Sequence, residues 1–212
     1  MIQANMDTLT LLKTLEFPDG KTFCVLGDEA EKLKIFKYPE IYHLMRVYSP
    51  YKETSFNKIL NLTPNALVAL LSTGDVALIN TDSFYGTEYK AKQLDLKSKI
   101  EGKQITDIFK VDNECFIAVD NFFTAVIVCT IKGDEIVQEK VIDISDLRII
   151  RDEKEYAESQ RFIEAKRQDN NRVTILVKFE SKQKLTHEES VLLHKQIELT
   201  ENVYFNEFTV NL

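Results

Sequence analysis

The 212-residue chain is 44% hydrophobic and 29% charged, so it can bury a core, and its composition excludes an intrinsically disordered protein. Its formal net charge of -7 weighs against a general nucleic-acid-binding protein, because contacts to phosphates need clustered lysine and arginine. The three cysteines, Cys24, Cys115 and Cys129, are odd in number and lie in apolar runs, which argues against a disulfide framework and favours a reducing compartment.

A weak unit recurs along the sequence. It consists of an apolar stretch, a turn rich in proline, aspartate or asparagine, a second apolar stretch, a short polar gap and a third apolar stretch. The first copy spans about residues 11–48 and contains Leu11–Phe17, the turn Pro18–Lys21, Phe23–Asp28 and Leu33–Tyr38. Repeats at a fixed period indicate the architecture before any single residue does.

The second copy spans about residues 56–96 and lies about 45 residues further on; the third spans about 105–142, roughly 48 residues beyond the second. A fourth, looser copy covers about residues 159–211, and its spacing is stretched. The apolar runs are short, rich in Val, Ile, Leu, Phe and Tyr, and bounded by turn residues, so each copy is predicted to be a four-stranded antiparallel meander. Helices would need longer stretches with a period of 3.6 residues.

Second and fourth strands differ in polarity. The runs Ala66–Leu71 and Cys115–Val119 are continuously apolar, which predicts strands covered on both faces by neighbouring sheets. The stretches Thr87–Leu96 and Glu135–Ile142 are rich in polar residues, as expected of outer strands. From their place next to turn signals we predict that Phe17, Ile35, Leu70 and Ile117 pack in the core between sheets.

The first copy carries a family resemblance. Leu15–Lys21 resembles the strand and Pro-Asp-Gly turn of WD-repeat β-propellers, and Leu33–Phe36 resembles their third strand, which usually ends in Trp-Asp. The chain has no tryptophan, and Phe36-Lys37 stands where Trp-Asp is usual. The resemblance implies an all-β fold of about four blade-like antiparallel meanders, as a single domain over residues 1–212 or as the N-terminal segment of a propeller.

Propellers close with about four to eight blades, so four units lie at the lower limit. Three outcomes follow: a small closed propeller, an arc completed by another chain, or a piece of a longer protein. Because exposed strand edges and apolar blade faces are liabilities, we favour the last two over the first.

The clearest break in the repeat lies near residues 146–160. Asp152–Gln160 is charged and lacks β-branched residues, which favours a helical or mobile insertion on propensity. Such an insertion is either a plain surface loop or a place where a partner docks, since loops carry function on a rigid scaffold.

Two aromatic pairs are the candidate partner-binding residues. Phe84-Tyr85 and Phe122-Phe123 lie in gaps near predicted strand ends, where exposed aromatic side chains can anchor a partner. The alternative is that they pack between blades.

Catalytic signals are weak. His43, His187 and His194 have no metal-ligand spacing, and the sequence contains no nucleophile-elbow, P-loop or dinucleotide-binding glycine motif. We therefore expect no catalytic residue, cofactor or metal site. Four aspartates recur at turns, which turn chemistry explains, although acids can also gather at a propeller mouth: Asp19, Asp75, Asp112 and Asp134.

These observations predict a non-catalytic protein-protein interaction scaffold, a propeller-type subunit of a larger multiprotein assembly. The alternative is a hydrolase or lyase-type enzyme with acidic residues at the propeller mouth. Nucleic acid is an expected partner only through the basic stretch Lys90–Lys103. With no apolar stretch of about 18 residues and no signal-peptide layout in Met1–Asp7, we expect no membrane span and an intracellular, cytoplasmic or nuclear location.

Overall fold

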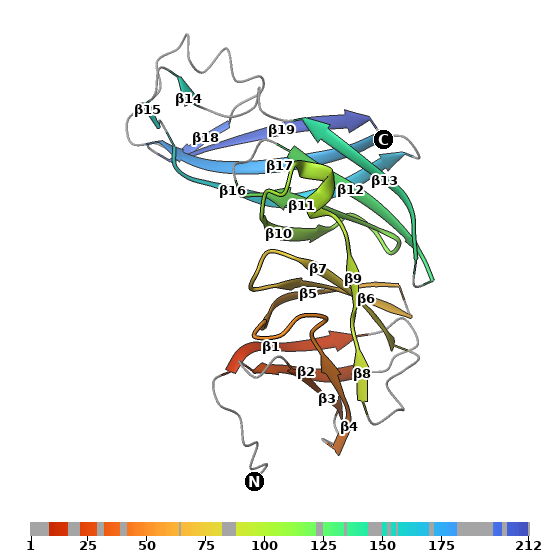
Figure 1. Ribbon diagram of the computed structural model, residues 1–212. Helices are drawn as coiled ribbons and strands as arrows, with labels where there is room; N and C mark the ends of the chain where they lie inside the picture. The colour runs from red at the N-terminus through yellow and green to blue at the C-terminus, as the bar shows by residue number, and fades with distance from the viewer. Residues whose placement is uncertain are drawn as a thin grey trace.

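The computed structural model is built almost entirely of strands that form four main sheets, here called sheets 1 to 4 (Figure 1). The structure describes residues 9–16, 22–28, 32–38, 42–63, 65–81, 88–121, 125–133, 135–143, 150–151, 154–155, 157–169, 172–181, 197–200 and 203–211.

Sheet 1 has the strand order β1-β2-β3-β4-β8 and begins with β1 (Leu9–Glu16), β2 (Thr22–Asp28), β3 (Lys32–Tyr38) and β4 (Tyr42–Tyr48). Alternation along β2 explains its orientation, because Phe23 and Val25 are buried while Cys24 between them is partly exposed. The fifth strand, β8 (Glu88–Lys90), pairs in parallel with β4.

Sheet 2 consists of β5 (Phe56–Thr63), β6 (Ala66–Leu71), β7 (Val76–Asn80) and β9 (Lys92–Leu94) in that order. Every residue of β6 is buried, which confirms that its continuous apolar run is covered on both faces. The predicted single outer strand Thr87–Leu96 is wrong in detail. Its described part divides between β8, which joins sheet 1, and β9, which completes sheet 2.

A short 3-10 helix, η2 (Lys97–Ile100), leads into sheet 3, which contains β10 (Ile105–Lys110), β11 (Cys115–Asp120), β12 (Ala125–Lys132) and β13 (Glu135–Asp143) in order. Again the whole second strand is buried. The outer strand β13 is mostly exposed, with Val137 and Val141 among its exposed side chains, as the polar composition of this stretch predicts.

Sheet 4 contains β16 (Ala157–Asp169), β17 (Arg172–Ser181), β18 (Ile197–Thr200) and β19 (Val203–Asn211), in the order β16-β17-β19-β18. The predicted meander is therefore wrong for this unit, because β19 lies between β17 and β18. A two-stranded hairpin, β14 (Ile150–Arg151) and β15 (Lys154–Glu155), precedes the sheet.

The sequence favours a helical or mobile insertion near residues 146–160, but the helical alternative does not form in the described part of this segment. Residues 150–151 and 154–155 pair with each other, and β16 begins at Ala157. Pairing of β16 along nearly the whole of β17 satisfies its backbone groups, so tertiary pairing overrides the weak helical propensity of the charged side chains.

The four sheets pack face to face in chain order as an open arc, with sheets 1 and 4 at opposite ends (Figure 1). Three buried apolar clusters join sheet 1 to sheet 2, sheet 2 to sheet 3 and sheet 3 to sheet 4. The prediction of core positions is confirmed for Ile35, Leu70 and Ile117, which are 0%, 5% and 0% exposed. Phe17 lies outside the described residues.

Candidate functional site

The first strands of successive sheets form a row along one margin of the arc. β1 contacts β5, β5 contacts β10, and β10 contacts β16. Hydrogen bonds show that neighbouring first strands run parallel, because residue numbers increase together on both strands. Between β1 and β5, Lys13 contacts Ile59 and Glu16 contacts Asn61. Between β5 and β10, Lys58 contacts Asp107 and Asn61 contacts Lys110. Equivalent turns of sheets 1 to 3 therefore lie at the same end of their strands.

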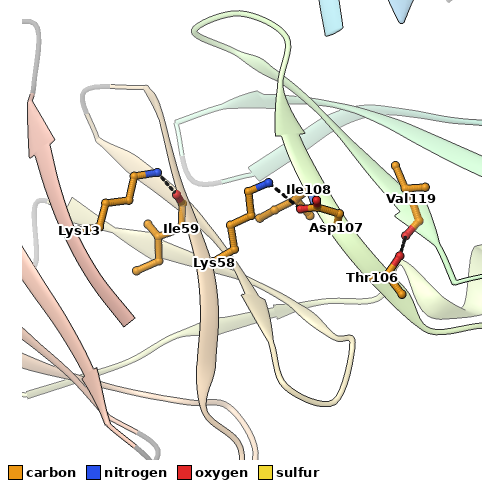
Figure 2. Close-up of polar contacts among 7 residues, drawn as sticks. All are labelled: Lys13, Lys58, Ile59, Thr106, Asp107, Ile108 and Val119. Atoms are coloured by element: carbon orange, nitrogen blue, oxygen red, sulfur yellow. Dashed lines mark hydrogen bonds and ion pairs between the residues drawn. The ribbon is translucent and has the colours of Figure 1, made fainter. Parts of the chain in front are cut away.

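Polar side chains connect this row (Figure 2). The Lys13 Nζ donates to the Ile59 carbonyl at 2.5 Å, and the Lys58 Nζ pairs with Asp107 Oδ1 at 2.6 Å. Asp107 Oδ1 also accepts from the Ile108 backbone N–H at 2.8 Å, which fixes its carboxylate next to β10. Each of these contacts joins or braces neighbouring first strands.

Two further bonds extend the pattern. The Lys110 Nζ donates to the Asn61 carbonyl at 2.8 Å, and the Asn61 side-chain amide donates to the Glu16 carbonyl at 2.7 Å. Since backbone carbonyls accept these bonds, the side chains satisfy strand-edge groups that no neighbouring strand in the row pairs. The lysines thus act as braces between sheets.

Lysine charge accumulates along the row. Burial lowers the pKa of Lys13, and the nearby positive charges of Lys58 and Lys110 lower it further. Burial also lowers the pKa of Lys110, against the opposite effect of Asp112. Both the burial of Lys13 and the neighbouring lysines therefore disfavour its charged form.

The junction of sheets 3 and 4 uses an ion pair. The Arg167 Nε contacts Asp112 Oδ2 at 2.5 Å, with about a quarter to a third of each side chain exposed. Burial raises the pKa of Asp112, but the hydrogen bonds from Arg167 and from the backbone N–H groups of Glu114 and Cys115 outweigh it, so the pKa lies below its ordinary value. This turn aspartate therefore has a structural partner that the sequence did not reveal.

The acidic-mouth arrangement does not form from Asp75 and Asp112. Asp112 follows β10, in the turn before the second strand of sheet 3, whereas Asp75 precedes β7, in the turn after the second strand of sheet 2. Because the first strands run parallel, these two turns lie at opposite ends of the strands. Asp75 is bound by Thr73 Oγ1 at 2.6 Å and by the Lys97 Nζ at 3.0 Å. Asp19 and Asp134 lie outside the described residues.

The basic stretch Lys90–Lys103 is partly neutralised. Lys97 pairs with Asp75 and donates to the Thr73 carbonyl at 2.8 Å, so it anchors η2 to sheet 2. Lys99 pairs with Glu139 of β13 at 2.6 Å, and this pairing raises the pKa of Lys99. Lys90 and Lys92 are exposed. Two lysines of the stretch considered for nucleic acid therefore link η2 to sheets 2 and 3.

The predicted aromatic anchors Phe84, Tyr85, Phe122 and Phe123 all lie outside the described residues. Within the described part of the chain, no group of three or more His, Cys, Asp or Glu side chains could hold a metal ion. No helix among the described residues is both long and apolar enough to cross a membrane.

Solved structures similar to this chain include β-propeller domains. The β-propeller domain of Cps50 (Swd1) from Myceliophteria thermophila superposes with a TM-score of 0.50 at 8% identity over 96% of this chain and 54% of that one. Hsv2p of Kluyveromyces lactis gives 0.46 at 7% identity, covering 66% and 49%, and the WD40 β-propeller domain of Doa1 gives 0.40 at 13%, covering 76% and 47%.

The chain thus spans about half the length of the propellers that it matches. No protein-family model matches the sequence, and no curated protein matches it. The likeness to Cps50 shows the fold alone: the chain has the architecture of a β-propeller arc, and its described sheets do not close into a ring.

Proposed function

We propose that this chain is a non-catalytic scaffold, a propeller-type subunit that holds partner proteins in a larger assembly inside the cell. The observation that supports this most directly is the outer face of sheet 1, at one end of the arc. The outer face of sheet 1 carries partly exposed apolar side chains, which a neighbouring chain could cover.

The face of sheet 1 that points away from sheet 2 carries Cys24 and Leu26. Their neighbours Phe23 and Val25 point toward sheet 2 and belong to the buried cluster there, so alternation places Cys24 and Leu26 on the opposite face. Both side chains are partly exposed. A partner chain, or a further part of a longer protein, would bury them.

The corresponding face of sheet 4 carries polar side chains and, by alternation with Thr174, the partly exposed Leu176. Ala165, Val173 and Ile175 point toward sheet 3, whereas Thr174 lies between Lys166 and Thr209 on the far face. The two threonine hydroxyls are 3.3 Å apart and share a hydrogen bond.

Three free cysteines supply a built-in probe for this proposal, because Cys24 is partly exposed while Cys115 and Cys129 are buried. Maleimide should label Cys24 in the folded chain and spare the other two. Burial raises the pKa of Cys24, so its labelling rate should rise with pH to a midpoint above that of a free thiol.

The experiment is affinity purification of the tagged chain from its native source, followed by maleimide labelling before and after the associated proteins are removed. The proposal expects co-purifying chains that protect Cys24. Leu26→Lys should release them, whereas Thr209→Lys, on the far face of sheet 4, should not. A chain that purifies alone as a monomer, and turns over compounds of a metabolite panel, would support the enzyme alternative.

A further inference from the structure

We propose that the outer edge of β13 is a strand-acceptor site that binds an extended segment of a partner protein by main-chain pairing. This inference deepens the proposed function and rests on it, because it specifies how a scaffold of this shape would hold one class of partner.

The edge itself is the first observation. β13 is nine residues long and, among the described strands, pairs only with β12, so one of its edges has no described neighbour. In an edge strand every second residue points its N–H and C=O groups outward, where they can pair with an added strand. The outer edge of sheet 2 is formed by β9, which has only three residues.

The same position in sheet 1 is already used in this way. β4 and β13 are each the fourth strand of their sheets, and the outer edge of β4 accepts β8. The pairing is parallel, joins Arg46 to Glu88 and Tyr48 to Lys90, and continues in a bond from the Ala91 N–H to the Tyr48 carbonyl at 2.9 Å. The molecule thus contains one example of a separate extended segment that adds to the outer edge of a sheet.

β13 is also rigidly held, which an acceptor strand requires. Glu139 pairs with Lys99 of η2 at 2.6 Å, and the Lys140 Nζ donates to the Asn211 carbonyl of β19 at 2.9 Å. These side chains lie on opposite faces of sheet 3, so β13 is fastened on both faces, while no described strand pairs with its outer edge. Binding a segment here would cost little ordering of the acceptor.

A pocket next to this edge supplies a place for a side chain. It has a volume of about 370 Å³ and is lined by Ile100, Ala125 and Val141, with a charged rim formed by Lys99, Glu101, Lys103 and Asp143. Val141 and Val137 are the exposed large apolar side chains of the described residues, at 42% and 57%. Because side chains of an added strand alternate, one of them would enter the pocket beside Val141.

The occupant is therefore an extended peptide segment with an apolar residue that fills the pocket and apolar residues at alternate positions. Main-chain bonds to β13 supply affinity, and the pocket supplies the register. The charged residues around the pocket favour polar residues in the peptide on either side of the apolar residue that fills it.

The test uses a phage-displayed library of random 12-residue peptides selected on the immobilised chain. We expect enriched peptides with alternating apolar residues, and their binding to protect amides of residues 135–143 from hydrogen exchange. Val141→Lys should weaken binding of the enriched peptide by about tenfold or more, since a lysine at an edge opposes pairing. Val141→Thr keeps the β-branched shape without charge and should change it by less than about threefold.

Val137→Lys provides a second variant, and circular dichroism with an unfolding midpoint checks that each variant folds. No enriched peptide, equal binding to Val141→Lys, or protection confined to other strands would overturn the inference. A dimer of the free chain that Val141→Lys dissociates would instead assign the edge to a second copy and overturn the partner assignment. If Val141→Lys leaves the native assembly and Cys24 protection intact and also fails to weaken the peptide, this inference fails while the proposed function stands.

Discussion

Truncation of Ile117 tests whether the sheets are held together mainly by their apolar faces. Ile117 is the central residue of the buried strand β11, is 0% exposed and belongs to the cluster between sheets 3 and 4. Ile117→Ala removes three carbon groups, which costs roughly 2.4 kcal/mol in transfer free energy at about 0.8 kcal/mol each. The cavity left behind raises the expected loss in the free energy of unfolding to about 3–4 kcal/mol.

The assay is equilibrium urea unfolding followed by circular dichroism. Ile117→Val should cost only about 1 kcal/mol, because it removes one methylene group. Val137→Ala, at a position that is 57% exposed, serves as the control and should change stability by about 0.5 kcal/mol or less. If Ile117→Ala and Val137→Ala destabilise the chain equally, the interface between sheets 3 and 4 does not contribute as a packed core.

Two further predictions concern polar contacts and turns. Because the pKa of Asp112 is lowered in the folded chain, its pairing with Arg167 stabilises the fold above the ordinary carboxyl pKa of about 3.8, and this contribution is lost as the pH falls through the lowered folded value. Arg167→Gln should therefore lower the free energy of unfolding at pH 7, and the difference from wild type should disappear in acid. The control Arg172→Gln, in an exposed pair, should cost about 0.5 kcal/mol or less at either pH. The same pH dependence of unfolding for both variants would contradict this reasoning. Gly74→Ala should cost more than about 1 kcal/mol, because φ is +74° and the new Cβ would lie 2.9 Å from a backbone carbonyl of β10. Gly133→Ala is the control for backbone strain alone, because φ is +65° there and, apart from its chain neighbours, no described residue has an atom within 4 Å of the new Cβ. Gly74→Ala should lower the urea midpoint more than Gly133→Ala, and the reverse order would refute the steric reasoning.

The repeat was predictable because it is encoded in sequence spacing. The contacts between first strands join residues separated by 46 and 45 positions for sheets 1 and 2, and by 49 for sheets 2 and 3. These values agree with the steps of about 45 and 48 residues expected from the apolar pattern. The contact from Asp112 to Arg167 spans 55 residues, which matches the stretched spacing of the fourth copy.

Long-range pairing was not predictable from local pattern. Glu88–Lys90 alternates as an outer strand whether it joins sheet 1 or sheet 2, and only the tertiary structure places it on β4. The ion pairs of Lys97 and Lys99 join segments 22 and 40 residues apart, so a basic stretch in the sequence becomes a set of braces in the fold. The order of β19 and β18 is likewise set by pairing between distant strands, which no local signal encodes.

The two margins of the arc differ in how they are built, and this difference bears on stability. Along the margin of first strands, each junction contains a long cationic side chain of one sheet that reaches an acceptor on a neighbouring sheet, as Lys13, Lys58 and Arg167 do. The outer margin has no such uniformity, because β8 pairs with β4, β9 is short, and β13 is long and has no described strand on its outer edge. The repeated contacts between first strands fix the spacing of the sheets. The outer edges of the sheets differ in length and pairing, so they differ in which further strands they can bind. Substitutions along the first strands should therefore lower the free energy of unfolding, whereas substitutions at the outer edges should change it less.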